Sequence, residues 1–146
     1  MKAAAAAAVV LDASAALELL LPDSAAHFAL AADLMEKVAG NNLVAHVPLL
    51  FFNEVAAGCA GAVRGGRANR VDAQAFLHRL AAVPLQLSVE IHSASDWFDR
   101  ALKLNCQGAD SAYLATAIEL RLPIATFDGG LATAARSNKA KLYFPQ

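Results

Sequence analysis

The segment Val9-Val10-Leu11-Asp12 places a run of branched apolar residues directly before a single acid. A continuous apolar run of this kind is typical of a strand that is buried on both faces, as strands of parallel sheets are. Longer segments with helical character follow it and alternate with further short apolar runs. Strands separated by helices predict an α/β fold, a three-layer sandwich with a short parallel central sheet covered on both faces.

Turn residues divide the rest of the chain into the expected elements. Strands are expected at residues 8–11, 43–47, 85–89, 123–126 and 141–144. Helices are expected at residues 14–20, 24–38, 48–63, 71–82, 93–104, 109–120 and 131–137. Pro22, Gly40 and the Gly65-Gly66 pair lie between these segments, where prolines and glycines interrupt regular structure. The Ala-rich start of the chain is interpreted as the lead-in to the first strand.

The length and composition favour one apolar domain over residues 1–146. Hydrophobic residues make up 58% of the chain and charged residues 17%, which excludes an intrinsically disordered protein. The apolar excess predicts that some surface is buried against a partner, and we expect a homodimer formed through the helices at 14–20 and 24–38. A formal net charge of −1 gives no whole-molecule signal of nucleic-acid binding, although a local basic patch would suffice.

The cysteine count and the start of the chain bear on its location. Two cysteines are too few for a disulfide framework or a zinc cluster, and they indicate a reducing compartment. The first eleven residues resemble the start of a signal peptide, but one positive charge precedes the apolar run and Asp12 ends it. No segment approaches the roughly 20 apolar residues of a membrane span. We therefore expect a cytoplasmic protein with no membrane partner.

Four acids stand alone in apolar segments, whereas the remaining acids share polar segments with other charges. They are Asp12, Glu54, Asp110 and Asp128. A lone carboxylate in apolar surroundings carries a desolvation penalty that something must compensate. One explanation is structural: three of the four acids cap helices, and Glu54 forms a buried ion pair.

The positions of these acids favour a second explanation. Asp12 closes the first strand and Asp128 follows the fourth, while Asp110 begins a helix and Glu54 lies one turn into the helix after the second strand. In open α/β sheets, the carboxyl ends of strands and the adjoining helix starts form the ligand crevice. Converging carboxylates repel one another unless protons or cations neutralise them. They therefore predict a site for a hard divalent ion, Mg²⁺ or Mn²⁺, of the kind that serves phosphoryl chemistry.

The acids lie in four strings that occur in a fixed order. These are VLDASAAL at residues 10–17, PLLFFNEV at 48–55, GADSAYLA at 108–115 and IATFD at 124–128. Together they resemble the PIN domain family, and most closely its VapC-type ribonuclease toxins from toxin–antitoxin pairs. The resemblance implies a flavodoxin-like sandwich, a Mg²⁺- or Mn²⁺-dependent endoribonuclease, a homodimer and a cognate antitoxin protein. It also implies that the four lone acids are the catalytic metal ligands, and that Ser14 and Thr126 orient ligands or water beside them.

An RNA substrate calls for basic side chains that contact phosphates. The best local basic stretch contains Arg64, Arg67 and Arg70, opposed by Asp72. One interpretation is an RNA-binding patch that holds phosphates beside the acids. The other is a solvated loop and helix face.

Three other classes of protein share parts of this pattern. Haloacid-dehalogenase phosphatases need an Asp-x-Asp pair after the first strand, where this chain has Asp12 and Ser14. Receiver domains need paired acids near the first strand and a lysine after the last one, and neither feature is present. A catalytically silent PIN-like module that sequesters a protein or RNA is the alternative that stays open.

Overall fold

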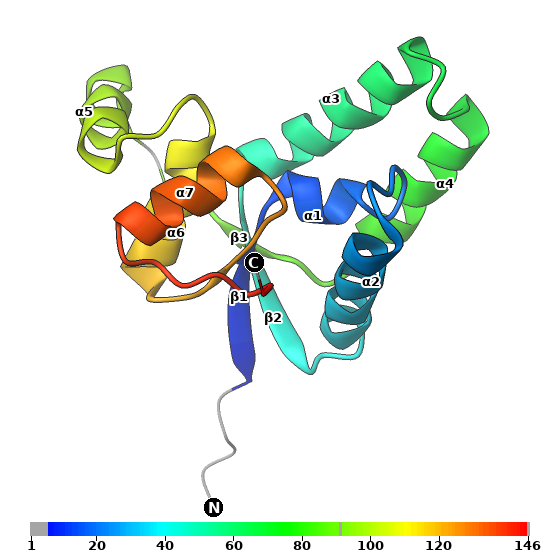
Figure 1. The fold of residues 1–146 in the computed structure, drawn as a ribbon, viewed down its shortest axis with the longest axis horizontal. Helices are drawn as coiled ribbons and strands as arrows, with labels where there is room; N and C mark the ends of the chain where they lie inside the picture. The colour runs from blue at the N-terminus through cyan, green and yellow to red at the C-terminus, as the bar shows by residue number, and fades with distance from the viewer. Residues whose placement is uncertain (1–5, 91, 146) are drawn as a thin grey trace, which may run out of the picture.

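The structure is a computed structural model that describes residues 6–90 and 92–145. Residues 1–5 of the Ala-rich lead-in lie outside the described residues. The elements in chain order are β1 (Ala7–Leu11), α1 (Ala13–Leu17), α2 (Ala25–Ala39), β2 (Leu43–Pro48), α3 (Leu50–Arg64), α4 (Arg70–Ala81), β3 (Gln86–Ser88), α5 (Ala94–Leu104), α6 (Asp110–Leu120), β4 (Ile124–Ala125) and α7 (Gly129–Ser137). Figure 1 shows their arrangement.

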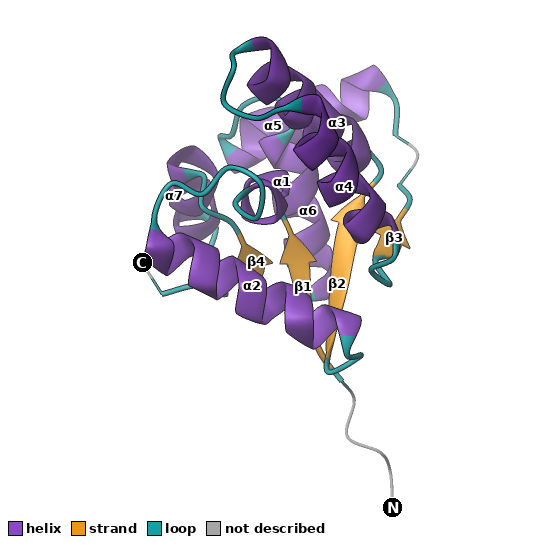
Figure 2. Cartoon of the chain, turned by 90° about the vertical axis from the view of Figure 1, so that its right-hand side faces the viewer, coloured by secondary structure: helices purple, strands orange, loops and turns teal. Residues whose placement is uncertain are grey.

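The four strands form one parallel sheet in the order β3-β2-β1-β4. Helix α2 lies in front of this sheet and α6 behind it in Figure 2, and α6 contacts β1, β2 and β4. Val9, Val10 and Leu11 of the central strand are completely buried, because helices cover both faces. The α/β fold with a short parallel central sheet is therefore confirmed.

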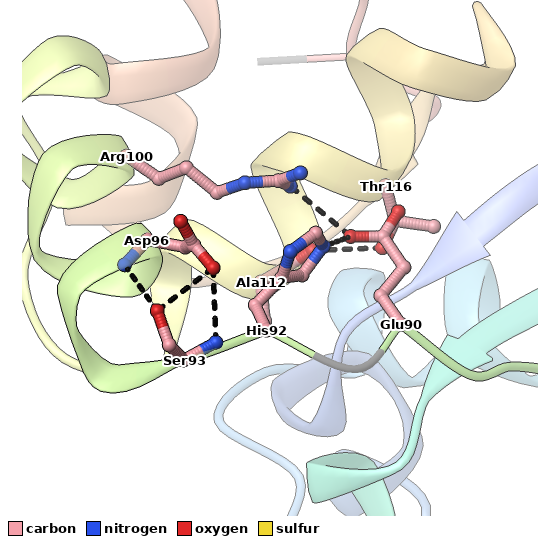
Figure 3. A network of polar contacts seen from close by, with 7 residues as sticks. All are labelled: Glu90, His92, Ser93, Asp96, Arg100, Ala112 and Thr116. Carbon is pink, nitrogen blue, oxygen red and sulfur yellow. Dashed lines mark hydrogen bonds and ion pairs between the residues drawn. The ribbon is translucent and has the colours of Figure 1, made fainter.

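Polar side chains fix where several helices begin. The Ser24 hydroxyl accepts a hydrogen bond from the backbone N–H of His27 at the start of α2. At the start of α5, Ser93 and Asp96 form a reciprocal capping box, which satisfies backbone N–H groups that lack partners in the first turn. Figure 3 shows this box together with Glu90, which pairs with Arg100 at 3.0 Å and thereby ties the loop before α5 to that helix. The expected helix at 93–104 is thus present, with Ser93 as its cap.

Two expected elements are wrong in part. The helix expected at 14–20 ends at Leu17, because the N–H groups of Leu19 and Leu20 bond to carbonyls three residues back and form a tight turn. The strand expected at 141–144 is reduced to one parallel bridge between Ile124 and Leu142. Its neighbour β4 has only two residues, so it offers little backbone for a longer pairing. Within the described residues, no helix is long and apolar enough to cross a membrane.

Candidate active site at the carboxyl edge of the sheet

The strand order creates a switch point between β1 and β4. The chain runs from β1 outward to β2 and β3 on one side, and β4 then adds to the other side of β1. Asp12 follows β1 and Asp128 lies three residues beyond β4, so both lie at the carboxyl edge of the sheet. Glu54 is in the second turn of α3, and Asp110 is the first residue of α6. Ligands of open α/β sheets bind at this kind of position.

The carboxylate of Asp12 is held by two hydroxyl groups. Asp12 is 5% exposed, and its Oδ2 accepts hydrogen bonds from Ser14 Oγ at 2.5 Å and Thr126 Oγ1 at 2.8 Å. Burial raises the pKa of Asp12, and the two hydroxyl hydrogen bonds oppose that rise because they favour the charged form. Asp12 occupies the N-cap position of α1, but its main hydrogen-bond partners are the two side-chain hydroxyls and not the first N–H groups of the helix.

The same hydroxyls fix the loop that follows β4. The backbone N–H of Phe127 donates to Ser14 Oγ at 3.0 Å, and that of Asp128 donates to Thr126 Oγ1 at 2.9 Å. The Asp128 carboxylate in turn accepts from the N–H of Leu131 at 2.8 Å and caps α7. Helix capping is therefore correct for Asp128, and this bond also sets the direction of its carboxylate.

Glu54 has a hydroxyl partner instead of the ion pair considered from the sequence. The phenol of Tyr113, which is completely buried, donates a hydrogen bond to Glu54 Oε2. Burial raises the pKa of Glu54, the bond from Tyr113 opposes this, and the charges of Asp12 and Asp128 raise it further. Sequence reasoning missed Tyr113. The available signal was its spacing, since it lies three residues after Asp110 and on the same side of α6.

Asp110 shows that the four acids share one electrostatic environment. Burial raises its pKa to about 6, and the charges of Asp128, Asp12 and Glu54 contribute in that order. Unlike Asp128, Asp110 does not cap its helix, since the N-cap residue of α6 is Ala109. The structure thus brings all four predicted acids together at one edge. Their ligand atoms are all carboxylate oxygens, which suit Mg²⁺ or Mn²⁺ better than softer metals.

The acids are near one another without being tightly clustered. Among the described residues, no three of them have ligand atoms that all lie within 4.8 Å of one another. Mutual repulsion accounts for this spacing, because neutralising charge is needed to bring several carboxylates into contact. A different group does meet that spacing: Glu18, Asp23 and His27. No spacing or motif in the sequence predicts that these three side chains meet.

The predicted basic residues lie apart from the carboxylates. Arg64 ends α3, and its separation of ten positions from Glu54 corresponds to roughly 15 Å along the helix. Arg67 lies in the turn before α4 and Arg70 is the first residue of that helix, so the group occupies the tip of the α3–α4 hairpin (Figure 1). All three side chains are exposed. They do not share one phosphate position with the acids.

Comparison with known proteins places this chain in a family. The PIN domain model matches residues 9–137, which is most of the chain. The chain therefore belongs to the PIN domain family, whose members are generally metal-dependent nucleases. Its fold is similar to the crystal structure of PAE2754 from Pyrobaculum aerophilum, with a TM-score of 0.63 and 20% identity over 90% of this chain and 87% of that chain. No curated protein sequence matches it significantly.

The raised pKa of Asp110 predicts an unusual pH dependence of stability. The folded carboxyl group holds its proton more tightly than the unfolded one. Its contribution to stability is therefore present below the ordinary aspartate pKa of 3.8 and is lost as pH rises through about 6. We expect the metal-free chain to lose stability relative to Asp110→Asn over this interval. Thermal unfolding of both proteins across the interval measures the difference. A difference in Tm that does not change with pH would contradict the assignment.

Proposed function

We propose that this chain is a Mg²⁺- or Mn²⁺-dependent endoribonuclease that hydrolyses RNA phosphodiester bonds at the carboxyl edge of its sheet. The observation that carries the proposal is the convergence of four carboxylates, in which the charges of the other three raise the pKa of Asp110. The nuclease chemistry of the PIN domain family supports it. The choice of RNA over DNA rests on the resemblance of the four acid-bearing strings to VapC-type toxins.

The residues of the site divide into ligands and positioning groups. Asp12, Glu54, Asp110 and Asp128 would hold the divalent ion. When bound, such an ion activates water and stabilises the attacking and leaving oxygens of an in-line displacement. Ser14 and Thr126 orient Asp12, and the phenol of Tyr113 orients Glu54. These bonds hold the carboxylates in place before the substrate binds, which reduces reorganisation during the reaction.

A cavity that reaches the start of α6 supports binding of a larger substrate or partner, and none of the four acids is among its lining residues. It has a volume of about 640 Å³ and lies between α5, α6 and the start of α3. Ala109 and Ser111, the neighbours of Asp110, line it, and so do the aromatic rings of Trp97 and Phe98. Aromatic rings offer stacking surfaces to unpaired bases. In this proposal, the arginines at the α3–α4 tip contact the RNA backbone away from the cleaved bond.

The proposal extends to a toxin of a type II toxin–antitoxin pair. In such a pair, a cognate antitoxin protein covers the apolar surface beside the active site, and here Leu49, Phe52 and Phe98 are exposed in that part of the molecule. A homodimer through α1 and α2 would cover further apolar surface, including the exposed ring of Phe28. Both partners follow from the resemblance and from the apolar composition of the chain.

Metal-dependent cleavage of purified RNA tests the activity. We expect the purified chain to cleave RNA but not single-stranded DNA in Mn²⁺ or Mg²⁺, and to lose activity when EDTA removes the metal. Asp12→Asn should abolish cleavage, whereas Asp33→Asn, an exposed change in α2, should not. Equal cleavage by the Asp12→Asn protein would contradict the proposed site. A folded, metal-bound chain that cleaves no RNA would favour the silent binding module.

A further inference from the structure

Three side chains around the turn between α1 and α2 converge away from the predicted quartet. Glu18 follows α1, Asp23 lies in the loop, and His27 is the third residue of α2. One carboxylate oxygen from each acid and one ring nitrogen of His27 all lie within 4.8 Å of one another. Both acids and the imidazole are side chains that bind divalent metals.

Glu18 is a buried carboxylate that the backbone holds in place. It is 3% exposed, and its Oε1 accepts hydrogen bonds from the N–H groups of Asp23 at 2.7 Å and Ser24 at 3.4 Å. Among the ion pairs of the described residues, none joins Glu18 to a lysine or arginine. Buried carboxylates normally have a cationic partner or a metal, so the charge of Glu18 lacks an expected counterpart.

His27 supplies an independent observation. Its Nδ1 is buried and, in the part of the chain that the structure describes, has no hydrogen-bond partner. The ring stacks on Phe127 with a centroid distance of 4.3 Å and an interplanar angle of 19°, which fixes its orientation. No hydrogen bond or ion pair between described residues joins the ring to Glu18 or Asp23. A buried polar atom without a partner calls for an explanation such as a bound ion.

We propose that Glu18, Asp23 and His27 form a second divalent-metal site, distinct from the carboxylate quartet. The mixed nitrogen and oxygen ligand set favours Zn²⁺ or Co²⁺ over Mg²⁺, which prefers oxygen ligands alone. Asp23 is exposed, so water has access to the remaining coordination positions. The ion compensates the buried charge of Glu18 and gives the imidazole of His27 a partner.

The contacts of His27 define what this metal does for the protein. Phe127 stacks on His27 on one side and on Phe144 at 4.5 Å on the other. The N–H of Phe127 also donates to Ser14, whose hydroxyl holds Asp12. An ion on His27 therefore stabilises the loop after β4 and the segment near the C-terminus. Its role is structural and requires no catalysis at the quartet.

Cobalt binding to a chain with a weakened quartet tests the site. The full chain carrying Asp12→Asn and Asp110→Asn provides the background, so that failure of the nuclease proposal does not affect the result. We expect one equivalent of Co²⁺, detected by visible absorption and displaced by Zn²⁺, together with a higher Tm. Loss of a group that only orients a metal ligand typically lowers metal affinity about 10–100-fold. His27 is proposed as a direct ligand, so adding His27→Gln should lower the affinity for Co²⁺ by at least about 100-fold.

Two further variants keep the test decisive. His78→Gln changes an exposed histidine of α4 and should leave Co²⁺ affinity unchanged. Asp23→Asn alters an exposed ligand, so it should weaken binding without unfolding the chain even if His27→Gln disturbs α2. Loss of the bound equivalent in either ligand variant supports the second site. Absence of Co²⁺ binding in the folded background, or full affinity in both ligand variants, overturns it.

Discussion

Asp110→Asn is expected to lower metal-dependent RNA cleavage by at least about 100-fold while leaving the fold intact. The amide keeps the shape of the side chain at the start of α6 but removes one negative charge from the ligand set. The charges of Asp128, Asp12 and Glu54 all raise the pKa of Asp110. Asp110→Asn therefore also relieves the repulsion between residue 110 and these three carboxylates. We therefore expect the metal-free variant to melt at the same temperature as the wild type or above it near neutral pH.

Cleavage rates in Mn²⁺ and thermal unfolding without metal, measured on the same preparations, separate these effects. Asp33→Asn is the matched control, because Asp33 is an exposed acid of α2 outside the proposed site and the basic patch. Its loss should not affect cleavage. Unchanged cleavage by a folded Asp110→Asn protein would remove Asp110 from the site. Loss of both fold and activity would show instead that Asp110 is needed for structure.

Thr126→Val is expected to destabilise the fold and to reduce cleavage together. Valine has a similar shape but removes the donor to the buried Asp12 carboxylate and the acceptor for the N–H of Asp128. Leaving a buried charged group with fewer partners costs about 2 kcal/mol. This corresponds to a decrease in Tm of about 4–8 °C for a chain of this size. Because Thr126 orients a proposed ligand, cleavage should fall by about 10–100-fold.

Thr116→Val is the matched control for this experiment. Thr116 is also buried, but its hydroxyl donates to the carbonyl of Ala112 within α6, a carbonyl that the helix already uses. Its replacement should cost about 1 kcal/mol or less. Thr116 lines the cavity at the start of α6 but holds no proposed ligand, so cleavage should fall far less than in Thr126→Val. Chemical denaturation of both variants gives the free energies of unfolding. Equal losses in the two variants would mean that the hydroxyl of Thr126 has no special relation to Asp12.

The main elements of the fold could be predicted because their signals are local. The run Val9-Val10-Leu11 indicates a strand that is buried on both faces, and the central strand β1 is of this kind. The helices expected at 24–38 and 93–104 each begin with a serine, and in the structure Ser24 and Ser93 cap α2 and α5. The prediction of a strand at 141–144 was wrong because these apolar residues pack without a long partner strand. Strand pairing depends on the neighbour, which a single segment does not reveal.

The four acids of the candidate site could be predicted because each is the only charged residue in an apolar stretch of the sequence. Each of the four acids stands alone in sequence because each lies at the edge of a buried element. Tyr113 gave no such signal, since an aromatic residue in an apolar helix is ordinary and its partner Glu54 is 59 residues away. Glu18, Asp23 and His27 were missed for a related reason. Their convergence depends on the tight turn after α1, which replaced the expected end of that helix.

The pairing of β1 with β4 also determines when the site forms during synthesis. The hydrogen bond from Thr126 to Asp12 joins residues 114 positions apart, so a growing chain makes it only long after Asp12 has been synthesised. A nascent chain that ends before Ile124 contains Asp12, Glu54 and Asp110 but lacks β4 and the loop that bears Asp128. Contacts between such distant segments also form slowly, because a long loop must close first. If the chain cleaves RNA as proposed, this order of assembly delays activity until β4 and the loop that bears Asp128 have been translated.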